Sequence, residues 1–139
     1  MAEHNPAIPM KKLTAFLCAL TLTPLLAMSA EKFPDISHEE LTKAIEEKKV
    51  ALIDVNGSDS YKAGHIPGAI DFESDKKDLA SKLPKDKDTL VVAYCGNEQC
   101  GAYQSAAKAA KELGYTNVKH YSKGIAGWKK SGAKVEKDS

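Results

Sequence analysis

The sequence predicts an α/β domain in which helices cover both faces of a parallel sheet. Its 139 residues are 42% hydrophobic and 28% charged, which suits one globular domain. Apolar runs such as VALIDV and DTLVVAY lack the alternation of a half-exposed strand, so we expect strands buried on both faces. Segments with helical spacing of apolar residues separate these runs, and alternation of strands with helices favours a parallel sheet.

Caps and apolar spacing predict the helices. Ser37 and Glu40 form an S-x-x-E capping box ahead of an amphipathic segment. An alanine-rich helix ends at Gly114, a typical C-terminal cap, and Trp128 is the expected apolar anchor of a short last helix. In chain order, the expected helical segments before the last helix are 37–49, a turn at 58–63, 74–84 and 101–114.

The strands are expected between these helices. The second one follows GHIPGA, where two glycines and a proline indicate a turn. The expected strands are 50–55, 69–72, 88–94 and 117–121.

Residues 1–30 are interpreted as a secretory signal peptide that precedes a domain at 31–139. Lysines precede an apolar stretch at 13–27, and Ala27 and Ser29 form a small-x-small cleavage site. A membrane anchor or buried helix is the alternative, but a bilayer span needs about twenty apolar residues and this stretch is shorter. We therefore expect an exported protein, periplasmic in a Gram-negative bacterium and secreted otherwise. The polar residues 1–9 indicate a start at Met10 or a longer leader.

The charge balance excludes some classes of partner. The chain has 20 basic and 19 acidic residues, which argues against nucleic acid or an anionic membrane as the main partner. We also expect no stable membrane insertion. Every basic residue is lysine. No guanidinium group is therefore present to hold an oxyanion in a bidentate manner.

Cys95 directly follows a predicted buried strand and precedes a helix. Ligands gather beyond the carboxyl ends of parallel strands, and loop amides with a helix dipole favour a thiolate there. These features predict that Cys95 is a nucleophile. The alternative is a structural disulfide between Cys95 and Cys100, although so short a loop removes little chain entropy.

Four segments resemble, in order, the signatures of the rhodanese-like domain family: LIDVNGSDSYKAGHIPGAIDF, VVAYCGNEQC, AAKAAKELGYTNVKHY and GIAGW. The resemblance covers nearly all of residues 31–139. It implies a three-layer fold with a central parallel five-stranded sheet flanked by helices. It also implies that Cys95 takes sulfane sulfur from a small donor as a persulfide. The sulfur then passes to cyanide, sulfite or a thiol, without a metal or organic cofactor.

The terminal persulfide sulfur carries negative charge, which loop amides can hold. We expect this substrate-binding loop to consist of Gly96, Asn97, Glu98, Gln99, Cys100 and Gly101. Many family members have arginines at positions that correspond here to Asn56 and Cys100. Their absence disfavours thiosulfate as the donor, and also the phosphatase activity of related Cys-x5-Arg loops.

Several roles stay open at this stage. Cys100 either resolves the Cys95 persulfide, releasing hydrosulfide and forming a disulfide, or packs under the loop as a bystander. Asp54 contacts the loop or caps the following turn, and His65 is an acid or base or orients its turn. Lys123 faces the site and attracts anions, or is solvated. The alternative functions are a periplasmic carrier or binding module that serves a partner protein, and a thiol-disulfide redox protein that needs a reductant.

Overall fold

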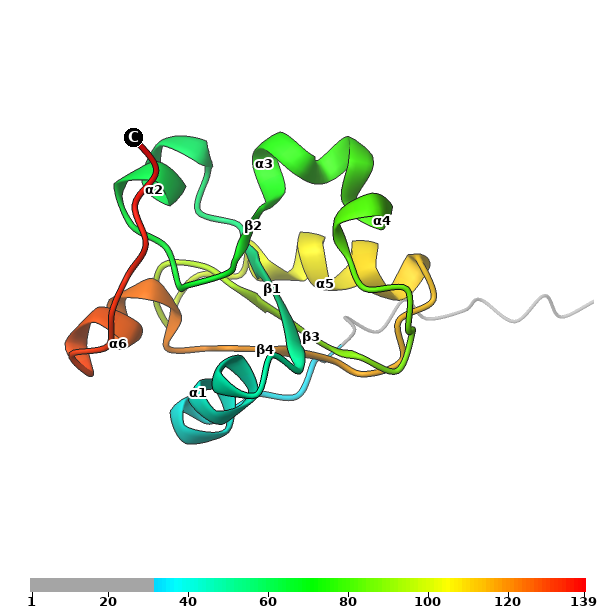
Figure 1. The fold of residues 1–139 in the computed structure, drawn as a ribbon, viewed down its shortest axis with the longest axis horizontal. Helices are drawn as coiled ribbons and strands as arrows, with labels where there is room; N and C mark the ends of the chain where they lie inside the picture. The colour runs from blue at the N-terminus through cyan, green and yellow to red at the C-terminus, as the bar shows by residue number, and fades with distance from the viewer. Residues whose placement is uncertain (1–31) are drawn as a thin grey trace, which may run out of the picture. The chain divides into compact units, whose positions relative to one another are not determined.

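The computed structural model describes residues 32–139, which form a three-layer α/β domain (Figure 1). Its sheet has four parallel strands in the order β2-β1-β3-β4. The strands are β1 (Val50–Asp54), β2 (Ile70–Asp71), β3 (Leu90–Tyr94) and β4 (Val118–His120). Because all neighbouring strands are parallel, their carboxyl ends meet at one edge. The predicted signal peptide lies outside the described residues and stays a prediction.

Helices cover both faces of the sheet, as predicted. In chain order they are α1 (His38–Glu46), α2 (Ser58–Ala63), α3 (Phe72–Asp75), η1 (Lys76–Asp78), α4 (Leu79–Lys82), α5 (Tyr103–Glu112) and α6 (Gly124–Lys130). Figure 1 shows α3, α4 and α5 on one side of the sheet and α1 and α6 on the other. The capping box of Ser37 and Glu40 is confirmed at the start of α1.

Neighbouring residues of each strand contribute to opposite halves of the core. Ile53 of β1 packs in the cluster that contains Ala107 of α5. Leu52, its neighbour, packs in the cluster that contains Trp128 of α6, which is the predicted anchor. Burial of each such side chain stabilises the fold by roughly 1.5–3 kcal/mol. Strands buried on both faces explain the continuous apolar runs in the sequence.

Within residues 32–139 the sheet has four strands, whereas the resemblance implies five. Beside β4, a single parallel bridge joins Asp35 to His120. The amide of Ile36 donates to the carbonyl of His120 at 2.9 Å, and the amide of His120 donates to the carbonyl of Pro34 at 2.9 Å. Pro34 has no N–H to extend this ladder, and the cap at Ser37 begins α1 directly afterwards. The fifth strand is therefore reduced to one bridge.

The predicted helix at 74–84 is divided into α3, η1 and α4. Asp71 accepts a hydrogen bond from the amide of Glu73, so helical structure begins at Phe72, which the sequence had placed in a strand. Asp78 leaves helical geometry at φ −124° and ψ 23°. The backbone carbonyl of Asp78 accepts a hydrogen bond from the hydroxyl of Ser81 at 2.8 Å. Among residues 32–139, no helix is long and apolar enough to cross a membrane.

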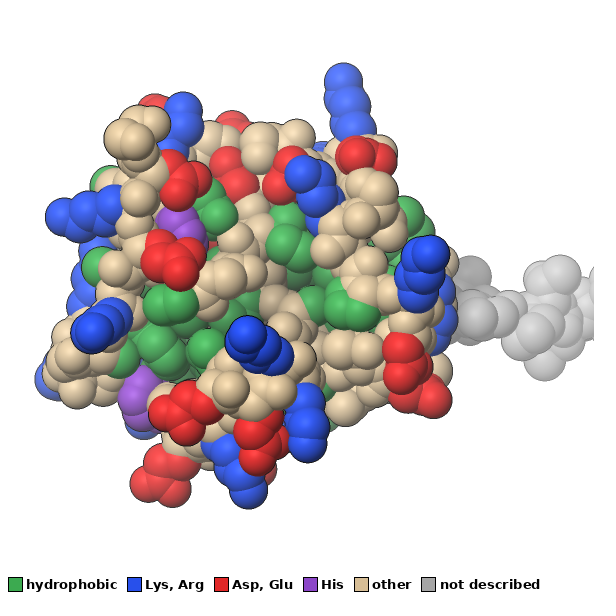
Figure 2. Space-filling view, in the orientation of Figure 1, with side chains coloured by type: hydrophobic (Ala, Val, Ile, Leu, Met, Phe, Trp, Pro, Cys, Tyr) green, Lys and Arg blue, Asp and Glu red, His purple; other side chains and the backbone are tan. Residues whose placement is uncertain are grey.

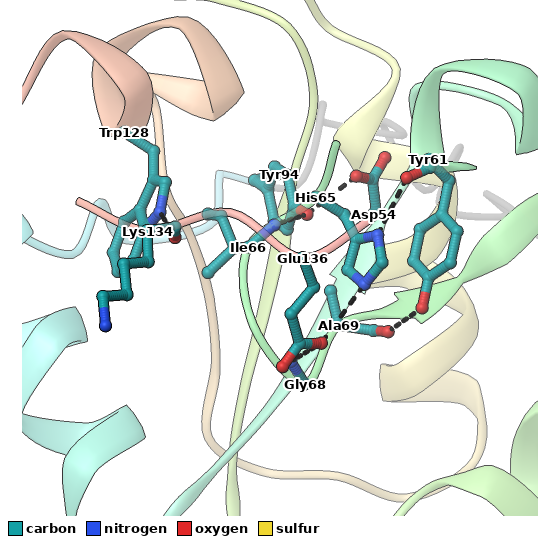
Figure 3. Close-up of polar contacts among 10 residues, drawn as sticks. All are labelled: Asp54, Tyr61, His65, Ile66, Gly68, Ala69, Tyr94, Trp128, Lys134 and Glu136. Carbon is teal, nitrogen blue, oxygen red and sulfur yellow. Dashed lines mark hydrogen bonds and ion pairs between the residues drawn. The ribbon is translucent and has the colours of Figure 1, made fainter. Parts of the chain in front are cut away.

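A buried tyrosine joins the two central strands to the turn that precedes β2 (Figure 3). Tyr94, at the end of β3, is 0% exposed. Its hydroxyl donates to Oδ2 of Asp54 at 2.7 Å and accepts from the amide of Ile66 at 3.0 Å. Burial raises the pKa of Tyr94, so the hydroxyl stays a neutral donor at all ordinary pH values.

We predict that Tyr94→Phe lowers the free energy of unfolding by about 1–3 kcal/mol, because it leaves a buried carboxylate and a buried amide without their partner. Urea unfolding would measure the loss. Tyr121→Phe is the matched control: Tyr121 is also buried, but its hydroxyl has one hydrogen-bond partner among residues 32–139, Nδ1 of half-buried His38 at 2.9 Å. We expect a smaller loss there, about 0.5–1.5 kcal/mol. Equal losses in the two variants would contradict a special role for Tyr94.

Candidate active site

Cys95 lies where the sequence predicts it, directly after the central strand β3 and at the carboxyl edge of the sheet. It is 3% exposed, whereas Cys100 is half-buried. The two cysteines form a disulfide with a Cα–Cα distance of 6.2 Å. The eight-residue loop 95–102 thus leaves β3, turns back on itself through the disulfide and leads into α5 at Tyr103. The loop therefore brings both sulfur atoms together.

Only part of the predicted anion-binding loop has free amides. The side chain of Asn97 accepts from the amide of Gln99 at 2.9 Å, and its carbonyl accepts from the amide of Cys100 at 3.1 Å. Within the described part of the chain, the other loop amides have no hydrogen-bond partner; they belong to Gly96, Asn97, Glu98 and Gly101. In this disulfide form, four loop amides can bind an anion instead of six.

The start of α6 donates hydrogen bonds to the first two residues of the cysteine loop, a contact that no local sequence signal predicts. The amides of Ile125 and Ala126 donate to the carbonyls of Cys95 and Gly96 at 2.9 and 3.0 Å. Gly124 has a φ of +60°, and a Cβ atom there would lie 2.5 Å from the carbonyl oxygen of Cys95. The GIAGW segment therefore needs glycine at this position because two backbones meet there.

Asp54, the last residue of β1, is buried, and both of its carboxylate oxygens accept hydrogen bonds. Its Oδ1 accepts from the amide of Asn56 at 2.7 Å, and its Oδ2 accepts from the hydroxyl of Tyr94. Burial raises the pKa of the Asp54 carboxyl, and these hydrogen bonds oppose the shift. Asp54 thus caps the turn after β1, which was one of the two predicted roles.

Asn56, which stands where many family members have arginine, lies against the loop. Its Oδ1 would be 3.5 Å from a Cβ atom on Gly96. Its Nδ2 is buried and has no hydrogen-bond partner among the described residues. A neutral amide donor therefore lies beside the cysteine loop, without the positive charge of a guanidinium group.

His65 orients its own turn. Among the described residues it contacts Tyr61 and Glu136, and no contact joins it to the cysteine loop. It is 2% exposed and stacks on Tyr61, with ring centroids 3.7 Å apart. Its Nδ1 lies 2.8 Å from the carbonyl of Tyr61, and its Nε2 lies 3.4 Å from Glu136 (Figure 3). Paired backbone hydrogen bonds also join His65 to Glu136, at 2.9 Å each. The turn is thus tied to the C-terminal segment, a contact that no local sequence signal predicts.

A pocket of about 700 Å³ lies between the cysteine loop and α6. Loop residues 97–99 form one wall, and the other is formed by Lys123, Ala126, Gly127, Lys130 and Ser131. Lys123 thus lies in the wall of this pocket opposite loop residues 97–99, and its predicted attraction of anions stays a prediction. Elsewhere, Figure 2 shows lysines and acidic side chains interspersed over one face of the molecule, in keeping with the balanced charge. Within residues 32–139, no cluster of three or more His, Cys, Asp or Glu side chains could hold a metal ion.

The family model of the Rhodanese-like domain matches residues 37–131. The chain belongs to the rhodanese-like domain family. The matched segment includes the sheet, the cysteine loop and α6. The family and the fold class that the sequence predicts are therefore confirmed.

Relatives of this rhodanese-like chain differ in their overall architecture. An HTH-type transcriptional regulator of Mycobacterium tuberculosis is 34% identical over 102 residues, which cover 73% of this chain. The chain spans only 44% of the length of that regulator. The thiosulfate sulfurtransferase GlpE of Coxiella burnetii is 30% identical over 98 residues, which cover 70% of this chain and 88% of GlpE. The family thus includes sulfurtransferases.

Solved structures agree on the fold. The solution structure of the rhodanese-like domain of the Anabaena protein Alr3790 superimposes with a TM-score of 0.60. The two are 24% identical, and the match covers 76% of this chain and 80% of that domain. At this identity the similarity supports a shared fold.

We predict that Gly124→Ala destabilises the domain by about 2–4 kcal/mol, because it combines left-handed backbone strain with overlap against the Cys95 carbonyl. Urea unfolding would measure the loss. Gly132→Ala is the control, since Gly132 also has a positive φ, of +82°, but faces open space. It should lose only about 1 kcal/mol. A Gly124→Ala variant no less stable than this control would contradict the proposed close contact.

We also predict opposite pH dependences for two carboxyl groups. The pKa of Asp54 is raised in the folded protein, so the folded state binds its proton more tightly than the unfolded state. This group therefore makes stability fall as pH rises from its ordinary pKa through the folded one. The pKa of Glu40 is lowered by hydrogen bonds from Ser37, so its contribution is lost as pH falls through the folded pKa.

Urea unfolding across the acidic range would test this contrast. Subtracting the curve of Asp54→Asn from that of the unchanged protein should leave a stability difference that falls with rising pH. The same subtraction for Glu40→Gln should leave a stability difference that rises with rising pH. A difference of the same sign for both variants would refute the assignment.

Proposed function

We propose that this chain is a sulfurtransferase in which Cys95 carries sulfane sulfur as a persulfide. The observation that carries the proposal is the position of Cys95 directly after the central strand, in a loop that has four amides unpaired within residues 32–139 and contacts Asn56 at Gly96. Backbone N–H groups beside a sulfur favour its anionic form. Membership of a family that includes sulfurtransferases supports the same reaction.

The transfer has two steps. The Cys95 thiolate attacks the outer sulfur of a small sulfane donor, the rest of the donor leaves with the electron pair, and a persulfide forms on Cys95. An acceptor such as a thiolate, sulfite or cyanide then attacks the outer persulfide sulfur, and Cys95 leaves as thiolate. The only covalent carrier in this cycle is the persulfide, so no further cofactor takes part. With Asn56 in place of arginine, polysulfide suits the site better than the thiosulfate dianion.

Cys100 gives the persulfide a second outcome. Its thiolate attacks the inner sulfur on Cys95, releases hydrosulfide and forms the disulfide, which an external dithiol then reduces. The disulfide between Cys95 and Cys100 supports this resolving role. Because Cys100 is more exposed than Cys95, the incoming reductant attacks Cys100 and Cys95 leaves as thiolate.

The disulfide also favours one alternative function, a thiol-disulfide redox protein that uses Cys95 and Cys100 without moving sulfur. A carrier that passes persulfide to a partner protein would need the same Cys95 chemistry. Export through the predicted signal peptide would suit either function, because an oxidising compartment preserves disulfides.

Intact-protein mass spectrometry of the reduced protein would test the proposal, after exposure to polysulfide and, separately, to thiosulfate. We expect a gain of about one sulfur mass, ~32 Da, that Cys95→Ser abolishes, with polysulfide the better donor. A mass loss of two protons without any gain of sulfur would favour the redox alternative and contradict sulfurtransferase activity.

We further predict that Cys100→Ser lengthens the lifetime of the Cys95 persulfide by about tenfold or more, because the resolving thiol is removed. Release of hydrosulfide, followed with the mass of the protein, would measure it. Ser105→Ala, an exposed change in α5, is the control and should leave the lifetime unchanged. An unchanged lifetime in Cys100→Ser would make Cys100 a bystander.

A further inference from the structure

We propose that residues 133–138 form a C-terminal strap that the imidazolium form of His65 latches onto the GHIPGA turn, and that loss of the His65 proton opens it. The strap follows α6 and lies beyond residues 37–131, the segment that the family model matches. Figure 1 shows the chain running from α6 past α2 to its C-terminal end. This regulation goes beyond the proposed sulfur transfer and does not depend on it.

A few local contacts fasten the strap to the domain. The indole Nε1 of Trp128 donates to the carbonyl of Lys134 at 2.8 Å (Figure 3). His65 and Glu136 exchange two backbone hydrogen bonds of 2.9 Å each, as a pair in an antiparallel sheet does. Between these contacts, half-buried Val135 packs against the apolar cluster that contains Trp128. With so few contacts, the strap can open locally while the sheet stays folded.

One carboxylate oxygen of the strap contacts two residues of the turn. Oε2 of Glu136 lies 3.4 Å from Nε2 of His65 and accepts from the amide of Gly68 at 3.2 Å (Figure 3). The His65 side chain is 2% exposed, whereas that of Glu136 is 56% exposed. The turn therefore presents two N–H groups to the strap if Nε2 carries a hydrogen.

Both ring nitrogens of His65 face an acceptor. Nδ1 lies 2.8 Å from the carbonyl oxygen of Tyr61, which can only accept, so Nδ1 carries a hydrogen. A neutral ring would then direct the lone pair of Nε2 at the Glu136 carboxylate, and the two would repel each other. The imidazolium ring has a hydrogen on each nitrogen and donates to both acceptors. The contacts of the closed strap therefore suit the protonated ring.

Other charged groups lie around His65, and the one that contacts its ring is a carboxylate. Four carboxylates interact electrostatically with Tyr61, whose ring stacks on His65, and they belong to Asp54 of β1, Asp71 of β2, and Glu136 and Asp138 of the strap. The lysines of the neighbouring elements are Lys62 of α2, Lys129 of α6, and Lys134 and Lys137 of the strap. Figure 3 shows the ammonium group of Lys134 directed away from His65. Closing the strap thus brings negative charge to the ring.

The direction of the pH effect follows from this contact. Histidine changes its charge between about pH 5 and pH 8. The closed strap places the Glu136 carboxylate at the ring, so the closed state binds the His65 proton more tightly than the open state does. By linkage, the proton favours closing to the same extent, and the strap opens as pH rises through this range. For a pair with an exposed carboxylate, we expect an effect of about threefold on the opening equilibrium.

Opening of the strap reaches the cysteine loop through the next residue of the turn. The amide of Ile66, directly after His65, donates to the hydroxyl of Tyr94 at 3.0 Å. Tyr94 in turn directly precedes Cys95. A strap that is closed in mildly acidic solution therefore supports the turn that braces the end of β3, and its opening loosens that support.

Amide hydrogen exchange, corrected for the intrinsic effect of pH on exchange, would measure the opening. We expect the protection of the Glu136 amide to fall about threefold from about pH 6 to about pH 8. The Ile66 amide should change in the same direction. Glu136→Gln keeps a side-chain acceptor but loses the charge, so its protection should not depend on pH. Asp138→Asn, which removes the other strap carboxylate, is the matched control and should keep the fall.

The linked measurement is the titration of the His65 ring, followed by NMR. A threefold coupling corresponds to about 0.5 pH unit, so Glu136→Gln should lower the midpoint of the His65 titration by that amount. His120, whose Nε2 lies 3.8 Å from Asp35, is the internal control and should keep its midpoint. The latch is refuted if Glu136→Gln leaves either the pH dependence of protection or the His65 midpoint unchanged. Constant protection of Ile66 while the strap opens would refute the coupling to the cysteine loop.

Discussion

The buried hydroxyl of Tyr94 is the interaction on which the rest of the site depends. It receives the amide of Ile66 and donates to Asp54, so one atom joins the carboxyl ends of β1 and β3 to the GHIPGA turn. Cys95 is the next residue after Tyr94. Since buried polar groups are costly when unpaired, this bridge stabilises the carboxyl ends of β1 and β3 directly before Cys95.

The cysteine loop is held firmly by backbone contacts and is poor in positive charge. α6 donates two amides to the first carbonyls of the loop, and Gly124 allows that close approach. Within residues 32–139, unpaired amides lie in the loop and the neutral Asn56 lies against Gly96, while Lys123 and Lys130 line the neighbouring pocket.

The sequence predicted most of the fold because its signals are local. The capping box at Ser37, the apolar runs of β1 and β3 and the glycine cap at Gly114 each act within a few residues, and the structure agrees with all of them. The segment 74–84 was predicted as one helix, since its apolar spacing gives no sign of the Asp71 cap or of the backbone break at Asp78. The implied fifth strand is a single bridge because Pro34 has no backbone N–H to donate to the next hydrogen bond of the ladder.

The sequence by itself determined the family, the alternation of strands and helices, and Cys95 as the residue beyond the central strand. Only the tertiary structure decided which side chains surround that cysteine. The clamp from α6, the contact of His65 with Glu136 and the pocket that includes Lys123 all join residues distant in the chain. Periodicity and caps report on neighbours within a turn or a strand, whereas these contacts exist only after the sheet brings its carboxyl ends to one edge.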